Sequence, residues 1–265
     1  MNAFWTDHPR DVLRVSGDDA LTYLQSQISQ DVRNLADGES TYTFVLQPTG
    51  KVEALARIRR VSATEFLLDT DVGFGEPLRA RLARFKIRVK VDLDVVEAAC
   101  VAVRGEGGSR PDGAVAAWGR DDAYDVFDGA APAGLVSGGG DDLLRARIDA
   151  GWPAMGAEIT DATIPAESGV VDLAVSFTKG CYPGQELVER MDSRGSTAPR
   201  FVRRLSGTGA IADELTHDGK VVGHVTSSVA VEDGRWTGLG VVARSVQPGE
   251  TIESSGGPVS VSEGR

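Results

Sequence analysis

Cysteine is scarce in this chain of 265 residues, which has only Cys100 and Cys181. Two cysteines in a chain of this length do not make a disulfide framework, and a reducing compartment would keep both as thiols. Cys100 lies in the apolar run EAACVAV, which is typical of a buried strand, so a small core residue is its simplest interpretation. Cys181 has no such apolar cover, which makes it the cysteine available for chemistry.

Long apolar runs are also absent. No segment has about 18 or more consecutive apolar residues, the length that a membrane-spanning helix needs. The start of the chain, MNAFWTDHPRDVLRV, lacks the basic and apolar regions of a secretory signal. We therefore expect a cytoplasmic protein without a membrane partner.

Positive charge is in short supply. The formal net charge is -11 at pH 7, with a sequence pI near 4.8, which argues against a general nucleic-acid binder that works by neutralising phosphates. The segment LRARLARFKIRVKV is a local exception, and most such runs are solvated faces, the alternative being a site for an anionic ligand or partner. Its basic residues are Arg79, Arg81, Arg84, Lys86, Arg88 and Lys90.

Several familiar sites lack their residues. The three histidines, His8, His217 and His224, lie in contexts that suggest a terminus, a turn and a barrel strand, so a cysteine hydrolase with a histidine base is a weak interpretation. No Cys and His group has zinc spacing, and neither a GxxxxGK[ST] loop nor a strand-associated GxGxxG motif is present. These absences argue against zinc sites and phosphate-loop nucleotide sites.

The N-terminal half predicts alternating strands and helices. Strands are expected at 11–17 and 64–70, in a hairpin that turns at QPTGK (residues 47–51), and over 87–103. Two helices are expected, one within 16–32 with Ser16 as its N-cap and one over 76–86. Their inward-facing residues should be Leu21, Leu24 and Ile28 in the first helix and Leu78, Leu82 and Phe85 in the second.

The C-terminal half has a different character. Residues 104–142 are rich in Gly, Ala and Asp, which predicts short strands joined by loose loops. A helix over 142–151 should end at Gly151, a plausible C′ glycine. Beyond Phe201, short Val-rich stretches between frequent turns are typical of a small β barrel or sandwich.

The segment KGCYPGQE, residues 179–186, places a lysine two residues before the unprotected cysteine. If residues 178–182 are extended, Lys179 and Cys181 project to the same face, and the ammonium would favour the thiolate. The following YPGQELVERM predicts a turn into a helix whose N-terminus adds to this effect, with Glu186 and Arg190 paired one turn apart. The alternative is a turn that needs small residues, with Lys179 bridging to a carboxylate.

Longer stretches around this segment resemble a known family. SFTKGCYPGQELVERMDSRG looks like the signature of the YgfZ-type folate-binding proteins, relatives of the aminomethyltransferase (T-protein) of the glycine cleavage system. Four further stretches are similar to the same superfamily: VSGDDALTYLQSQISQDV, VLQPTGKVEALARI, RARIDAGWPAMGAEI and IPAES. The resemblance spans most of the chain, with 100–142 and the C-terminal end matching only in character.

The resemblance implies an α+β fold arranged as a three-part ring around a central cavity that holds tetrahydrofolate or a one-carbon derivative. Its parts would be a split α+β domain at 1–50 and 143–203, a ferredoxin-like inserted domain at 51–142, and a small C-terminal β barrel at 204–265.

It also implies a function. The chain would be a tetrahydrofolate-binding accessory protein, working as a monomer, that supports iron–sulfur cluster assembly or repair and through it tRNA modification. Its partners would be folate and iron–sulfur enzymes or assembly proteins. Cys181 would be the functional thiol, tuned by Lys179, and Arg190 and Arg194 could meet the anionic glutamate tail of folate. The pocket would be shaped by Tyr182, Gln185, Glu186 and Arg190.

The sequence departs from the family in ways that leave alternatives open. The acidic catalytic residue of T-proteins has only Asp71 and Glu76 as nearest candidates, and the RTGYTGE-like folate motif is missing. Where some relatives line the pterin site with tryptophan, this chain has Arg10 and Leu143, which leaves two aromatic candidates, Trp118 and Trp152. The alternatives are a folate-dependent aminomethyltransferase that uses Asp71 or Glu76, and a scaffold without folate.

Overall fold

The structure is a computed structural model that describes residues 2–105, 110–193 and 198–265. The chain divides into two compact units, one formed by Met1–Gly138 and Val171–Glu189 and the other by Gly139–Val170 and Arg190–Arg265. The three domains predicted from the sequence, and their arrangement as a ring, stay predictions. In the described part of the chain, no helix is both long and apolar enough to cross a membrane.

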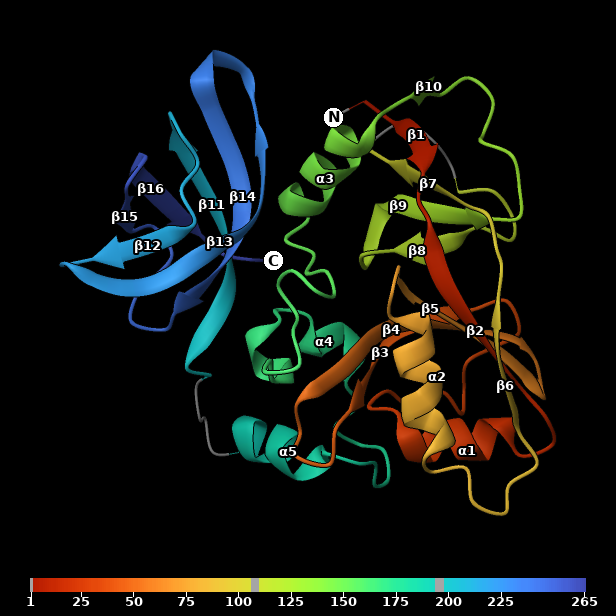
Figure 1. Cartoon of the computed structure of the whole chain (residues 1–265). Coiled ribbons are helices and arrows are strands. Elements are labelled where there is room, and N and C mark those ends of the chain that lie inside the picture. The colour runs from red at the N-terminus through yellow and green to blue at the C-terminus, as the bar shows by residue number, and fades with distance from the viewer. Residues whose placement is uncertain (1, 106–109, 194–197) are drawn as a thin grey trace. The chain divides into compact units, whose positions relative to one another are not determined.

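The first unit contains a five-stranded antiparallel sheet with two helices packed on it (Figure 1). The helices are α1 (Ala20–Gln27) and α2 (Gly75–Ala83). In spatial order the strands are β3 (Ser40–Leu46), β4 (Val52–Ser62), β5 (Glu65–Asp71), β2 (Arg10–Ser16) and β6 (Asp92–Val96). The predicted hairpin at QPTGK is confirmed as the β3–β4 pair.

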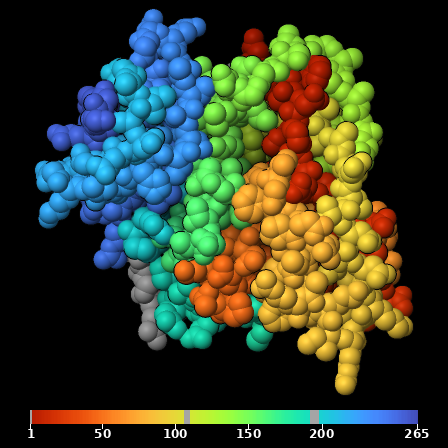
Figure 2. Space-filling model, viewed as in Figure 1, coloured from red at the N-terminus to blue at the C-terminus, as the bar shows by residue number. Residues whose placement is uncertain are grey.

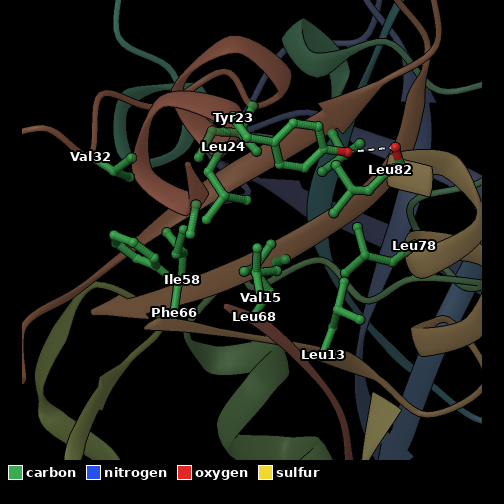
Figure 3. Close-up of a cluster of buried hydrophobic side chains, with 14 of the residues drawn as sticks. Leu13, Val15, Tyr23, Leu24, Val32, Ile58, Phe66, Leu68, Leu78 and Leu82 are labelled. Atoms are coloured by element: carbon green, nitrogen blue, oxygen red, sulfur yellow. Dashed lines mark hydrogen bonds between the residues drawn. The ribbon is translucent and has the colours of Figure 1, made fainter. Parts of the chain in front are cut away.

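One hydrophobic cluster joins this sheet to its helices. Leu13 and Phe66 from the strands, Leu24 from α1, and Leu78 and Leu82 from α2 are fully buried in it (Figure 3). The predicted inward face of α1 is confirmed, since Ile28 is also buried and Leu21 packs against the cluster. Burying a Leu or Phe side chain contributes about 1.5–3 kcal/mol, so this cluster holds α1 and α2 in place.

Two details of these helices differ from the prediction. Ser16 is the last residue of β2, and Asp19 occupies the N-cap of α1 without a side-chain hydrogen bond. The N-cap prediction is therefore wrong, because β2 continues one residue further than the helix signal suggested. Phe85 lies beyond the end of α2 and is 37% exposed, so it does not continue the inward stripe of Leu78 and Leu82.

A second five-stranded sheet of the first unit has the order β10-β1-β7-β9-β8. Its strands are β1 (Phe4–Asp7), β7 (Cys100–Arg104), β8 (Val115–Ala117), β9 (Arg120–Phe127) and β10 (Val136–Ser137). Cys100 is buried there as predicted, and burial raises the pKa of its thiol to about 12.

Buried ion pairs link the two sheets. The guanidinium of Arg57 on β4 pairs with Asp69 on β5 at 2.9 Å and with Asp125 on β9 at 2.8 Å, and Arg104 on β7 pairs with Asp125 at 2.8 Å. Arg57 also donates to the carbonyl of Ala116 at 2.9 Å. Because each buried charge has partners, removing one would leave the others uncompensated.

The second unit contains a closed barrel of six strands with the order β11-β14-β13-β12-β15-β16. The strands are β11 (Arg200–Thr208), β12 (Glu214–His217), β13 (Lys220–Ala230), β14 (Arg235–Ala243), β15 (Thr251–Ser254) and β16 (Gly257–Ser262). The predicted α+β fold with a C-terminal β barrel is confirmed.

The same unit holds α3 (Gly140–Asp149), which is followed by Gly151 with φ +62°. A Cβ at Gly151 would also collide with the backbone of Gly264, so the predicted helix end is confirmed. Within the unit, Glu158 is buried between α3 and the barrel, where it accepts from Arg147 at 2.8 Å, Thr226 at 2.6 Å and Ser227 at 2.7 Å.

Candidate functional site

The cysteine segment is an irregular loop of the first unit, between α4 (Val171–Ala174) and α5 (Gln185–Ser193). Residues 175–184 contain turns and a bend but no strand. Lys179 is only 6% exposed, whereas Cys181 is exposed. The expectation that both side chains project from one face of an extended segment is therefore wrong.

The ammonium of Lys179 is held by backbone oxygens. Its Nζ donates to the carbonyls of Gln25 at 2.8 Å, Ile28 at 2.6 Å and Gln30 at 3.0 Å. The Gln25 and Ile28 carbonyls belong to the C-terminal end of α1, where carbonyls lack helical partners and the helix dipole is negative. Burial lowers the pKa of Lys179 to about 8, and the carboxylate of Asp31 acts in the opposite direction. The lysine thus ties the loop to the end of α1.

A second set of bonds holds the start of the loop to the connection between α1 and β3. The Ser29 hydroxyl donates to the Ala174 carbonyl at 2.6 Å and accepts from the Phe44 amide at 2.8 Å. Gln30 donates its side-chain amide to the Leu173 carbonyl at 2.8 Å, and the Ser176 amide donates to the Ser29 carbonyl at 3.0 Å. The chain before Lys179 is therefore fixed at the end of α4 and at Ser176, two residues beyond it.

The far end of the loop is fixed by α5 and the hairpin turn. The Tyr182 amide donates to the Gln185 side-chain oxygen at 3.2 Å, which links the loop to the first residue of α5. Gly184 has φ +83° and packs so closely on the turn that a Cβ there would lie 2.5 Å from the Gln47 carbonyl oxygen. A Cβ at Gly50 would lie 2.5 Å from the Cβ of Leu187. The predicted turn into a helix is confirmed, and it rests on the β3–β4 turn (Figure 1).

Tyr182 lies inside this arrangement. Its side chain is 7% exposed, and its ring centroid is 5.2 Å from the Lys179 ammonium. Burial, with a smaller contribution from Glu189, raises the pKa of Tyr182 to about 12, so the phenol is neutral near neutral pH. Gln185 donates its side-chain amide to Glu189 on the next turn of α5.

Five of the predicted site residues lie in one stretch of the chain. Lys179, Cys181, Tyr182, Gln185 and Glu186 share one segment of the first unit. Cys181 and Glu186 are exposed, and the pairing of Glu186 with Arg190 stays a prediction.

Three further predicted site residues fall outside this stretch, although Arg190 follows on the same helix α5. Arg190 is exposed and Trp152 is buried, and both belong to the second unit. Arg194 lies outside the described residues. The other aromatic candidate, Trp118, is buried in the first unit with the Arg104 guanidinium 4.0 Å from its ring centroid.

The two acidic candidates for aminomethyl transfer are both engaged in ion pairs. Asp71 accepts from Arg10, whose guanidinium also pairs with Asp69 at 3.1 Å. Glu76 is exposed on α2 and pairs with Arg79 at 2.8 Å. Among the described residues, no group of three or more His, Cys, Asp or Glu side chains could hold a metal ion.

The most informative part of the site was missed in the sequence. The acceptors of the lysine are backbone carbonyls of residues 25, 28 and 30, about 150 residues earlier in the chain. Backbone acceptors carry no side-chain signal, so residue types could not identify them. Ser29 was missed for a related reason. In the sequence, a serine just after a helix has no feature that shows whether it will be buried and hydrogen-bonded.

Comparisons with known proteins bear on this fold. No family model matches the chain. The chain is 27% identical over 237 residues to an "Uncharacterized protein" of Haemophilus influenzae, covering 85% of this chain and 84% of that protein. It is 25% identical over 264 residues to the "tRNA-modifying protein YgfZ" of Hamiltonella defensa, covering 84% of this chain and 78% of that protein.

Two further comparisons agree with these. The protein of the same name from Vibrio vulnificus is 25% identical over 270 residues, covering 89% of this chain and 83% of that protein. The crystal structure of glycine cleavage system aminomethyltransferase T from Bartonella henselae superposes with a TM-score of 0.76 at 18% identity, covering 99% of this chain and 85% of that one. The resemblance predicted from the sequence is confirmed: the chain has a YgfZ-type fold of the aminomethyltransferase-like class.

Proposed function

On the premise of this YgfZ-type fold, we propose that the protein binds tetrahydrofolate or a one-carbon derivative and supports the upkeep of iron–sulfur enzymes, and through them tRNA modification, by means of the Cys181 thiol. The relatives named tRNA-modifying protein YgfZ and the aminomethyltransferase-like fold support the folate and tRNA parts of this proposal.

One observation carries the role of Cys181. Its thiol is exposed, yet the loop that bears it is fixed at one end by the buried Lys179 ammonium and at the other by α5 on the hairpin turn. A thiol that acts on a partner must be reachable and must also be held in a defined position. Cys181 meets both requirements, whereas Cys100 is buried in a strand.

Within this proposal, Lys179 is a positioning residue. Its three donors are directed at carbonyls of the α1 end, so its contribution is to hold the loop. We propose that Tyr182, Gln185, Glu186 and Arg190 line the folate pocket from the α5 side, and that Arg194 and Trp152 contribute further side chains.

The aminomethyltransferase alternative is not favoured. It needs Asp71 or Glu76 as an acid or base, and both carboxylates are already paired with arginines. The exposed pair of Glu76 with Arg79 would not by itself prevent catalysis, but Asp71 is held by an arginine that also pairs with Asp69.

The proposal is tested by anaerobic calorimetric titration with tetrahydrofolate and by complementation of a bacterium that lacks its own YgfZ protein. We expect saturable folate binding by the wild type and by Cys181→Ser, together with loss of tRNA modification in the Cys181→Ser strain only. Cys100→Ala is the matched control, because it removes the other thiol. Absence of folate binding would overturn the cofactor assignment, and full complementation by Cys181→Ser would overturn the role of the thiol.

A further inference from the structure

A short segment after α2 combines exposed apolar side chains with exposed basic residues. Residues 84–90, here called the basic strip, have the sequence RFKIRVK and connect α2 to β6. Ile87 is 72% exposed and Phe85 is 37% exposed. The strip belongs to the orange-yellow part of the chain, which lies at the surface of the first unit (Figure 2). These two apolar side chains are exposed in the same segment as four cations, Arg84, Lys86, Arg88 and Lys90.

Two of the four cations have no carboxylate partner. Lys86 pairs with Asp92 at 3.6 Å and Lys90 with Asp18 at 3.2 Å. Arg84 and Arg88 are exposed, and neither forms an ion pair with any residue that the structure describes. In a chain with a formal net charge of -11, two unpaired guanidiniums on one loop form a local positive site.

The strip is held in shape at both ends. The amides of Phe85 and Lys86 donate to carbonyls in the last turn of α2, at 3.0 and 3.2 Å. At the other end, the Lys90 amide donates to the Asp19 carboxylate at 2.8 Å. Between them Arg88 has φ +55°, a left-handed conformation that non-glycine residues rarely adopt. Such outliers persist where the surroundings enforce them, so the exposed side chains are presented from a fixed backbone.

We propose that the basic strip is a docking surface for a short acidic segment of a partner protein, with Arg84 and Arg88 binding its carboxylates and Ile87 contacting an apolar side chain. Arginine binds carboxylates through paired parallel hydrogen bonds, and protein interfaces combine arginine with apolar and aromatic residues at their centre. This inference does not depend on the folate or thiol proposals.

The other polyanions fit less well. Nucleic-acid binding through Phe85 has less ring surface on which a base can stack, because the Arg81 guanidinium covers one face at 4.3 Å from the ring centroid. Lipid surfaces are recognised by clusters of about 4–8 free Lys or Arg, whereas Arg84 and Arg88 alone are unpaired here. An extended anionic surface would also repel the acidic remainder of the chain. A short acidic peptide would contact the strip alone, so this repulsion would be smaller.

The test is fluorescence anisotropy of the full-length protein with a labelled short peptide in which glutamates flank a leucine. We expect saturable binding that weakens as salt rises, and that weakens about tenfold or more in the double variant Arg84→Glu with Arg88→Glu. Ile87→Ser should weaken it by about threefold, because the apolar contact is lost. Lys220→Glu, which reverses an exposed charge on the barrel, is the matched control and should leave binding unchanged.

Three outcomes would overturn the proposal. The first is absence of saturable binding by the wild type. The second is equal weakening by Lys220→Glu, which would indicate a general charge effect. The third is tighter, strip-dependent binding of a single-stranded RNA oligonucleotide or of phosphatidylserine vesicles. Circular dichroism of each variant shows that the fold is retained, so a loss of binding can be assigned to the surface.

Discussion

Replacing Lys179 by methionine should destabilise the first unit. The side chain is buried, and its Nζ donates to the carbonyls of Gln25, Ile28 and Gln30. Methionine has a similar length but no donor, so the carbonyls would lose their partner. Hydrogen bonds to a charged group contribute about 1.5–3 kcal/mol each, which gives about 4.5–9 kcal/mol for the set.

Part of this loss is offset. Burial lowers the pKa of Lys179 to about 8, so the folded protein bears a desolvation cost for the ammonium of roughly 3 kcal/mol, at about 1.4 kcal/mol per pH unit. Methionine removes that cost. The free energy of unfolding should therefore fall by about 1.5–6 kcal/mol at neutral pH, and a middle value of about 4 kcal/mol lowers the Tm of this unit by roughly 8–16 °C.

Thermal unfolding measured by circular dichroism checks the stability, with Lys220→Met as the control for loss of an exposed lysine. The alkylation rate of Cys181 by iodoacetamide checks the mechanism. If Lys179 holds the loop, this rate stays the same or rises in Lys179→Met. A tenfold fall in the rate would refute the anchoring role and restore direct activation of the thiol, and a Tm equal to that of the control would refute the energetic reasoning.

Three further predictions concern the frame around the site. Gly50→Ala should cost about 1–3 kcal/mol more than Gly73→Ala in urea unfolding, because both glycines have φ near +90° but only Gly50 faces Leu187; equal losses would argue against close packing of α5 on the hairpin. Burial lowers the pKa of His8 to about 4. As the pH drops from about 6.5 to 4, the histidine is therefore protonated in the unfolded chain but not in the folded protein, and the free energy of unfolding should fall. His8→Gln should flatten that part of a pH series of unfolding midpoints, and an unchanged slope would contradict the assignment. Arg57→Met should lower the free energy of unfolding by about 3–5 kcal/mol, since it leaves two buried carboxylates less compensated; a loss below about 1 kcal/mol would mean that the network relaxes around the gap.

Much of the fold could be predicted from local patterns. The hairpin at QPTGK, the helix end at Gly151 and the short C-terminal strands follow from turn residues and the spacing of apolar residues, which act over a few positions. The choice of a barrel over a sandwich came from the family resemblance. The family signature around Cys181 likewise pointed to the loop and to the helix after it. The ends of helices were predicted less accurately. Ser16 was predicted as the N-cap of α1 but is the last residue of β2, because a serine between a strand and a helix is compatible with either element.

The amino-acid sequence by itself determined that Cys100 is a core residue and that Cys181 is not, since the apolar neighbours of Cys100 require burial. Only the tertiary structure decided what Lys179 does. Its neighbours in sequence suggested an ammonium beside a thiol, but its partners are carbonyls at the end of a helix near the start of the chain. The burial and pairing of Arg57, Arg104 and Asp125 were equally out of reach. Long-range charge pairing depends on which strands meet, and local residue patterns do not record that.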